Sequence, residues 1–499
     1  MKADILFAFL FLNFLNSLSA QELEFNQNCR EAYLHVIALR FDEGRDLLEI
    51  ELDANPDNRI PLVLENYIDF LTVFISEDMA IFDQLKQNKT ERLRLIGLAQ
   101  DTSPYKNWAL AMINMQWAFA RLKFGEQFAA ALEIRRAFLL LEENNKKFPY
   151  FMQNKIGLGL LQTLIGSIPP QYQWVARLAS MHGTVHEGRN NLLDVIERSD
   201  LDPYTAHLKY ESLFFLSFIE MNLMADKSDF DFLIRSIGDK DTSNLLMSYI
   251  KANLLKKNAK NDLAIQILKR RPKSTNFYPF HYLDYLLAEA YLSKLQTELS
   301  SHYYQLFLDH FNGINYKQDA LRKLAWIKLL DDDMTGYVEY MDMVKSIDGG
   351  LVDADKQALR EANQGIPPQV DLLKARLLFD GGYHEKALDH LIHAQSVLTA
   401  NDYLEYHYRL GRIYHEMKFY DDATLHYNKT INLGAANPAY YAANAALKLG
   451  EIFEKQGNIE QAEACFNKCL GMKPEEYRSS IQQKARAGIS RLATYKKKR

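Results

Sequence analysis

Residues 404–476 read LEYHYRLGRIYHEMKFYDDATLHYNKTINLGAANPAYYAANAALKLGEIFEKQGNIEQAEACFNKCLGMKPEE, and this stretch decides the fold because it contains one pattern twice. The pattern is a large apolar, a small and an aromatic residue, followed by a second small and a second aromatic residue. In the first copy these positions are Leu410, Gly411, Tyr414, Ala423 and Tyr427. In the second copy they are Leu449, Gly450, Phe453, Ala462 and Phe466. Self-similarity at a period of roughly 40 residues is typical of a stacked helical array.

The spacing of the apolar residues in each copy predicts two helices joined by a turn. Apolar residues three and four positions apart form one stripe along a helix, as Tyr406, Leu410 and Ile413 do. Small residues such as Gly411 allow two helix axes to approach within about 8–10 Å, and an aromatic side chain fills the remaining volume. In the second copy Gly457 suits the turn, since glycine tolerates positive φ. A single hairpin cannot bury its stripe alone, so neighbouring hairpins must supply the other wall.

This pattern resembles the tetratricopeptide repeat. The second copy fills seven of the eight signature positions of that repeat, up to Pro474, and departs from it only at Ala446. The resemblance implies an all-α, right-handed superhelical solenoid of antiparallel helix hairpins. It also implies that the first helices of the hairpins line a concave groove that binds other molecules.

The rest of the chain divides according to how well it follows this register. For residues 21–241 the sequence predicts degenerate tetratricopeptide-like hairpins, and the repeat pattern cannot be followed between residues 148 and 241. Residues 242–476 predict more regular repeats, and residues 477–499 predict a capping helix with a basic tail. In a solenoid of this kind each unit is expected to touch only its neighbours.

The composition and the N-terminal residues indicate the kind of partner and the cellular location. The chain has 59 Lys and Arg against 64 Asp and Glu, a balance that argues against nucleic acid as the main partner. Residues 1–20 predict a signal peptide, with Lys2, an apolar run over 5–12 and small residues before Gln21. That run is too short to cross a bilayer, so no transmembrane span is predicted. We therefore expect an exported protein, periplasmic or secreted.

Histidine and cysteine pairs offer metal or redox chemistry only in weak form. His182 and His186 stand four apart, as zinc ligands do on a helix, but Gly183 lies between them and surface histidines are the alternative. His390, His426 and Cys465 share one repeat position, yet stacked helices lie about 10 Å apart, too far to share one zinc ion. Three cysteines are too few for a disulfide framework, and no cofactor is predicted.

Residues 331–342 partly follow the spacing of a calcium-binding loop. Asp331, Asp333 and Gly336 fit positions 1, 3 and 6, whereas Thr335 is a poor ligand and Asp342 stands where a Glu belongs. The alternative is an acidic cap at the N-terminus of a repeat helix, which the helix dipole favours. Whether this stretch binds calcium is left open by the sequence.

Glu211 and Ser212 are similar to the catalytic Glu-Ser pair of helical-solenoid lytic transglycosylases. The Gly-rich motifs that follow that pair in those enzymes are missing here, and an amphipathic helix accounts for both residues. We therefore predict that the protein is not an enzyme.

The tetratricopeptide resemblance assigns the groove to defined positions of each first helix. Carried onto this sequence, these positions are Tyr282, Tyr285, Glu289, Arg376, Glu405, Tyr408, Arg412, His415, Glu451 and Lys455. Arg376, Tyr408 and Arg412 would suit an acidic or C-terminal segment, and as exposed residues they should be replaceable by Ala without loss of folding. The chaperone-binding carboxylate clamp of the family is not expected, because Leu372 and Leu447 occupy the places of its cations.

The sequence thus predicts a non-catalytic scaffold of the cell envelope that binds a protein or peptide client. The alternative is an outer-membrane-associated glycan-binding or uptake protein, which would need Trp platforms on long loops and a lipid anchor. The identity of the client and the oligomeric state are not predicted.

Overall fold

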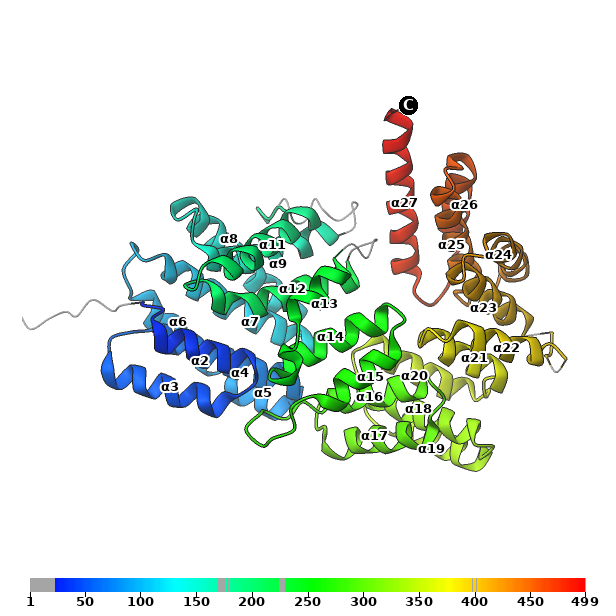
Figure 1. Cartoon of the computed structure of the whole chain (residues 1–499), viewed down its shortest axis with the longest axis horizontal. Helices are drawn as coiled ribbons and strands as arrows, with labels where there is room; N and C mark the ends of the chain where they lie inside the picture. The colour runs from blue at the N-terminus through cyan, green and yellow to red at the C-terminus, as the bar shows by residue number, and fades with distance from the viewer. Residues whose placement is uncertain are drawn as a thin grey trace, which may run out of the picture.

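The computed structural model describes residues 23–168, 176, 179–223, 229–396, 398–400 and 402–498. Every regular element within these ranges is a helix, and consecutive helices pack as antiparallel pairs along an array (Figure 1). The all-α repeat fold is therefore confirmed. The predicted signal peptide, residues 1–20, lies outside the described residues.

The first half of the array packs around the N-terminal hairpin. Its α-helices are α2 (Gln27–Ile37), α3 (Phe41–Ala54), α4 (Ile60–Ser76), α5 (Met79–Leu85), α6 (Asn88–Gly97), α7 (Pro104–Lys123), α8 (Gln127–Lys147), α9 (Met152–Ser167), α11 (Val185–Leu201), α12 (Lys209–Asn222) and α13 (Phe230–Ile237). The register lost from the sequence in this region corresponds to helices of unequal length. One hydrophobic cluster nevertheless runs from Leu23 to Leu377, across residue 241, and the proposed division there stays a prediction.

The second half is more regular. Its helices are α14 (Leu245–Lys257), α15 (Asn261–Arg270), α16 (Tyr282–Leu292), α17 (Thr297–His310), α18 (Lys317–Leu330), α19 (Met334–Ser346), α20 (Asp353–Gln364), α21 (Val370–Asp380), α22 (His384–Ala394), α23 (Tyr403–Glu416), α24 (Tyr420–Gly434), α25 (Tyr441–Lys455), α26 (Ile459–Gly471) and α27 (Arg478–Lys498). Helix α27 packs on α25 and α26 at the end of the array (Figure 1).

The small residues of the repeat pattern lie where the sequence places them. A Cβ atom added to Gly411 would come within 2.7 Å of Cδ1 of Tyr427, and one added to Gly450 within 2.5 Å of Cε1 of Phe466. Tyr427 and Phe466 are fully buried, so the pairing of a small residue with an aromatic ring holds both hairpins closed. The turn residue Gly457 has a φ of 76°, as expected for a left-handed turn position.

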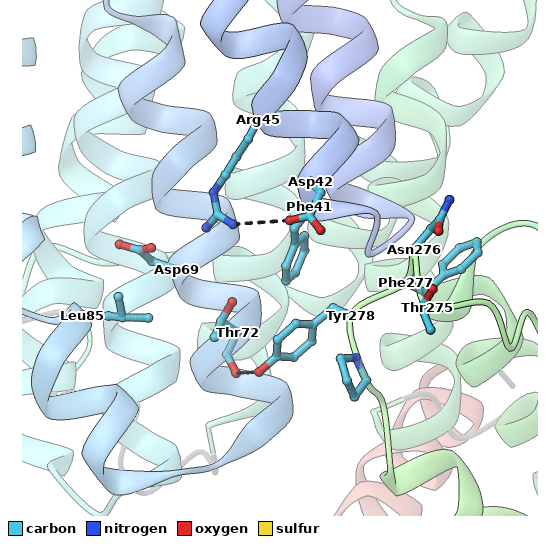
Figure 2. A pocket seen from close by; sticks show the side chains of 11 residues that line it. Phe41, Asp42, Arg45, Asp69, Thr72, Leu85, Thr275, Asn276, Phe277 and Tyr278 are labelled. Atoms are coloured by element: carbon cyan, nitrogen blue, oxygen red, sulfur yellow. Dashed lines mark hydrogen bonds and ion pairs between the residues drawn. The ribbon is translucent and has the colours of Figure 1, made fainter.

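The expectation that units touch only their neighbours is wrong, because the loop between α15 and α16 folds back onto the first hairpins. Tyr278 donates its backbone N–H to the carbonyl of Leu39 over 2.7 Å, and its ring lies 5.0 Å from that of Phe41. A cavity of about 350 Å³ lies at this junction, and Figure 2 shows the hydroxyl of Tyr278 directed at Thr72. Asn315 also donates to Glu77 over 2.5 Å, which joins parts of the chain 238 residues apart.

Helices α2, α4 and α12 meet at a buried carboxyl group. Glu211 accepts hydrogen bonds from the hydroxyls of Tyr33 at 2.5 Å and Tyr67 at 3.1 Å. Burial raises the pKa of Glu211 to about 7, and the two phenol hydrogen bonds act in the opposite direction. Ser212 donates to the carbonyl of Leu208 within its own helix. The hydrogen bonds of Glu211 thus hold the first hairpins to α12, whereas that of Ser212 is local.

This carboxyl group should make stability depend on pH. Its folded pKa lies above its value in the unfolded chain, so the stabilisation is present at low pH and is lost as the pH rises through about 7. One pKa unit corresponds to about 1.4 kcal/mol. Between pH 5 and pH 8 the free energy of unfolding of the wild type should therefore fall by about 2 kcal/mol relative to that of Glu211→Gln. Urea unfolding of both proteins across this range measures the difference.

The matched control for this prediction is Glu49→Gln, which removes an exposed carboxylate from α3. The free energy of unfolding of this control should change with pH as that of the wild type does. Parallel pH profiles for wild type and Glu211→Gln would contradict the assignment of the pH dependence to this junction.

Candidate binding surface

The first helices of successive units form one row, in which α18 contacts α21, α21 contacts α23 and α23 contacts α25. We call α16, α18, α21, α23 and α25 the first-helix row. The residues that the repeat register assigns to a binding groove all lie on it. Its side chains alternate aromatic rings with cations, as the following contacts show.

Three cations surround the indole of Trp326 on α18. The guanidinium carbon of Arg322 lies 4.7 Å from the indole centroid, that of Arg376 lies 4.9 Å from it, and Nζ of Lys323 lies 4.2 Å from it. The indole Nε1 donates to Glu361 over 2.6 Å, which fixes the orientation of the ring. Cation–π attraction holds charged groups over the ring, but the three positive charges repel one another.

Only one of these three cations has carboxylate partners within the described residues. Arg322 pairs with Asp319 and with Glu361, the latter at 3.4 Å, and Asp319 also accepts the hydroxyl of Tyr285 over 2.5 Å. Burial lowers the pKa of Lys323, and the nearby charge of Asp319 partly offsets this effect.

The next unit repeats the arrangement around Arg412. Its guanidinium lies 4.5 Å from the ring centroid of Phe379, and its Nη1 donates to the hydroxyl of Tyr408 over 3.1 Å. Asn444, from the following unit, donates to the same hydroxyl over 2.7 Å. Arg412 is half-buried.

The expectation that Tyr408 and Tyr285 are exposed anchors is wrong. Tyr408 has 0% and Tyr285 has 2% of its surface exposed. Both stand three residues before the small residue of their first helix, which is Ala288 or Gly411. In the structure this position lies between neighbouring first helices, where the ring fills the gap. Of the other assigned residues, Lys455 is exposed, and the rest are half-buried, namely Tyr282, Glu289, Arg376, Glu405, Arg412, His415 and Glu451.

The far end of the row is bounded by α27. Lys448 pairs with Glu451 at 2.8 Å, and Lys455 donates to the hydroxyl of Tyr420 over 3.0 Å. Burial lowers the pKa of Lys484 on α27, and the charges of Lys448 and Arg412 affect it as well. Helix α27, which carries Lys484, packs on α25, and Arg491 of α27 pairs with Glu454 of α25 at 2.7 Å, so Lys484 lies on a helix next to the row.

His415, also assigned to the groove, lies at the edge of this region. Its Nδ1 is 3.3 Å from the hydroxyl of Tyr427, and burial lowers its pKa. Glu289, at the opposite end of the row, pairs with Lys256 at 2.7 Å, and Tyr282 stacks on Tyr285 with centroids 5.1 Å apart. These residues are bound to their own neighbours and contribute shape rather than free charge.

The contribution of α18 was missed by the sequence analysis. The sequence signal was present, because Leu324 and Ala325 occupy the large apolar and the small position of the repeat pattern. In that register, Asp319, Arg322 and Trp326 take the positions assigned to the groove. Applying to this unit the register used for the others finds all three. Through them, Tyr285 on α16 connects to Arg376 on α21.

The weaker candidates of the sequence are placed by the structure in other roles. Asp333 accepts the backbone N–H of Gly336 over 2.8 Å and caps α19, as the alternative to a calcium loop predicts. His186 contacts Asn190, whereas His182 lies against Phe138. Within the described ranges, no three His, Cys, Asp or Glu side chains are grouped so as to hold a metal ion.

The remaining members of those sets are also accounted for. His390 lies 3.4 Å from Asp371, and the Nδ1 atoms of His407 and His426 are 3.0 Å apart. All three cysteines, Cys29, Cys465 and Cys469, are free thiols. Among the helices described, none combines the length and apolar character needed to cross a membrane.

Comparison with known proteins bears first on the repeat. Residues 402–475 match the family model of the tetratricopeptide repeat, so this part of the chain carries such repeats. No curated protein matches the chain.

Solved helical-repeat structures match over most of the chain with low scores. The human IFIT1 dimer with m7Gppp-AAAA is 12% identical, with 95% of this chain and 96% of that chain covered and a TM-score of 0.32. Yeast Tom70 is 13% identical, with 93% and 88% covered and a TM-score of 0.25. Scores this low carry no conclusion about function.

Proposed function

We propose that the protein is a non-catalytic scaffold that binds a segment of a partner protein along the first-helix row. The observation that carries this proposal is the alternation of aromatic rings and cations along adjacent helices, around Trp326 and around Arg412. Arg and aromatic side chains provide most of the binding energy at protein interfaces, because they combine area with directed hydrogen bonds.

The row offers binding groups without the features of a catalytic centre. Several of its carboxylates are engaged in ion pairs, among them Asp319 with Arg322 and Glu451 with Lys448. A glycan-binding function receives no support from the described Trp residues, since Trp108, Trp117 and Trp326 are all buried and form no open platform.

The predicted leader supports a place in the cell envelope. Residues 1–20 combine Lys2, an apolar run and small residues before Gln21, the order found in secretory signals. Mass spectrometry of the protein from its native cell should find a chain beginning near Gln21. An intact Met1 would contradict export.

Site-specific crosslinking tests the binding surface. A photoreactive amino acid placed at Lys455 on α25 or at Lys484 on the adjoining α27, both of which are exposed, should crosslink to one and the same partner protein in the native cell. The controls are Lys429 on α24 and Lys468 on α26, which are exposed on second helices. Because second helices lie outside the row, these positions should capture no partner in common.

Three outcomes would count against the proposal. The first is equal crosslinking from the control positions, the second is a different set of proteins from each position of the row, and the third is no crosslink at all. Identification of the crosslinked peptides by mass spectrometry separates these outcomes, since a specific site must return the same segment from both positions.

A further inference from the structure

Several cations on and beside the first-helix row have no carboxylate within 4.0 Å among the described residues. Those that lie nearest the aromatic rings of the row and at its far end are Lys323, Arg376, Arg412 and Lys484, and we call these four the cation row. The first three are half-buried, so they have lost part of their hydration. Arg322, Arg409 and Lys448 on the same surface are each paired with a carboxylate.

An unpaired cation that is partly removed from water is costly, and the cost grows when another positive charge lies nearby. Lys323 and Arg376 lie over the same indole as Arg322. Asp380, at the end of α21, is exposed and forms no ion pair with the cation row within the described part of the chain. The row therefore presents a net positive field that a negatively charged ligand can neutralise.

We propose that the occupant of the cation row is an acidic, extended segment of a partner protein, with carboxylates about three residues apart. This inference rests on the proposed function and specifies the chemistry of its client. The carboxylates would bind Arg376 and Arg412, with Lys323 and Lys484 on either side. Guanidinium groups bind carboxylates by paired hydrogen bonds, which give the contact geometric specificity.

The spacing of the carboxylates follows from the repeat. Arg376 and Arg412 hold the same position on first helices that are in contact, and such helix axes lie about 8–10 Å apart. A chain in the extended polyproline II conformation has three residues per turn and advances about 3.1 Å per residue, so side chains three residues apart lie on one face and about 9 Å from each other. An acidic residue at every third position therefore matches one cation of each unit.

The arrangement favours a peptide over a nucleic acid. Carboxylates stand between the cations along the row, namely Asp319, Glu361, Glu405 and Glu451. A nucleic-acid strand carries a charge about every 3.4 Å, so some of its phosphates would face these carboxylates. Separate acidic side chains can meet the cations and avoid the intervening carboxylates.

Fluorescence polarisation with three labelled probes tests the inference on the full chain. The first probe is a peptide of about twelve residues with Glu at every third position among Ser and Pro. The second replaces each Glu by Gln, and the third is a single-stranded RNA of about twelve nucleotides. The Glu peptide should bind at least tenfold more tightly than the Gln peptide, and its affinity should fall with added salt because the contacts are ionic.

Variants assign the binding to the cation row. The double variant Arg376→Gln/Arg412→Gln should lose at least tenfold in affinity for the Glu peptide, whereas Arg376→Lys/Arg412→Lys, which retains the charge but not the paired hydrogen bonds, should lose less than the Gln variant. The matched control, Lys429→Gln/Lys468→Gln, removes two exposed cations from second helices and should change affinity less than twofold. Unchanged helicity and melting of each variant establish that binding, not folding, is measured.

Each contrary result overturns the inference. The inference is wrong if the Glu peptide does not bind or if the Gln peptide binds equally well. It is also wrong if the control variant loses as much affinity for the Glu peptide as the Gln variant does. Finally, it is wrong if RNA binds more tightly than the Glu peptide and the Gln variant loses that binding. Crosslinking from Lys455 and Lys484 is independent of the charge of the client. A single crosslinked partner together with a negative peptide result would therefore refute the acidic client and leave the proposed function standing.

Discussion

Replacing Gly411 by Leu should destabilise the hairpin of α23 and α24 by about 3 kcal/mol or more, at the upper end of the range for overpacked cores. The Cβ atom alone would lie 2.7 Å from the ring of Tyr427, closer than two non-bonded carbon atoms approach. Tyr427 is fully buried and its hydroxyl contacts His415, so its ring has no free space to enter. The helices must then separate, which opens the contact that defines the repeat.

Hydrogen exchange measured by mass spectrometry suits this prediction, because an array of repeats need not unfold in one step. Protection should fall in α23–α26 before it falls in α2–α4, and the first thermal transition should move to lower temperature. Gly471→Ala is the matched control, since no atom lies within 4 Å of the added Cβ. Unchanged protection in Gly411→Leu would contradict the packing of α23 against α24.

Replacing Tyr408 by Ala should cost about 3–5 kcal/mol, the range found when a buried aromatic ring is removed. The ring has 0% exposure and lies 5.0 Å from that of Tyr441 in the next unit, so its loss leaves a cavity between two units. The burial of Tyr408 corrects the expectation that Arg376, Tyr408 and Arg412 can together be replaced by Ala without loss of folding. Only the two guanidiniums can be tested for binding alone.

Tyr408→Phe separates the hydroxyl from the ring. Its loss leaves donors of Arg412 and Asn444 without their shared acceptor, for a cost of about 1–3 kcal/mol. Urea unfolding with hydrogen exchange measures both variants. Tyr150→Ala is the control, since that ring is 89% exposed and its removal should change stability by about 0.5 kcal/mol or less. Wild-type stability in Tyr408→Ala would show that the ring is not buried between units.

The sequence alone determined those features that depend on residues close along the chain. Periodicity over residues 404–476 was sufficient for two helix hairpins, and the pairing of Gly411 with Tyr427 follows from it. The acidic cap at Asp333 was also accessible, because a cap involves a side chain and a backbone amide three residues later. The positions of Arg376 and Arg412 on adjacent first helices follow from the repeat register in the same way.

The tertiary structure decided which of those residues are exposed and which distant segments meet. The burial of Tyr408 depends on how closely α23 approaches α25, which is the sum of many contacts between units and is encoded by no single motif. The contact of Tyr278 with the first hairpin and that of Glu211 with Tyr33 join segments up to 239 residues apart. Such contacts depend on the curvature that accumulates over several units, because a small rotation per repeat brings distant units together only after several repeats.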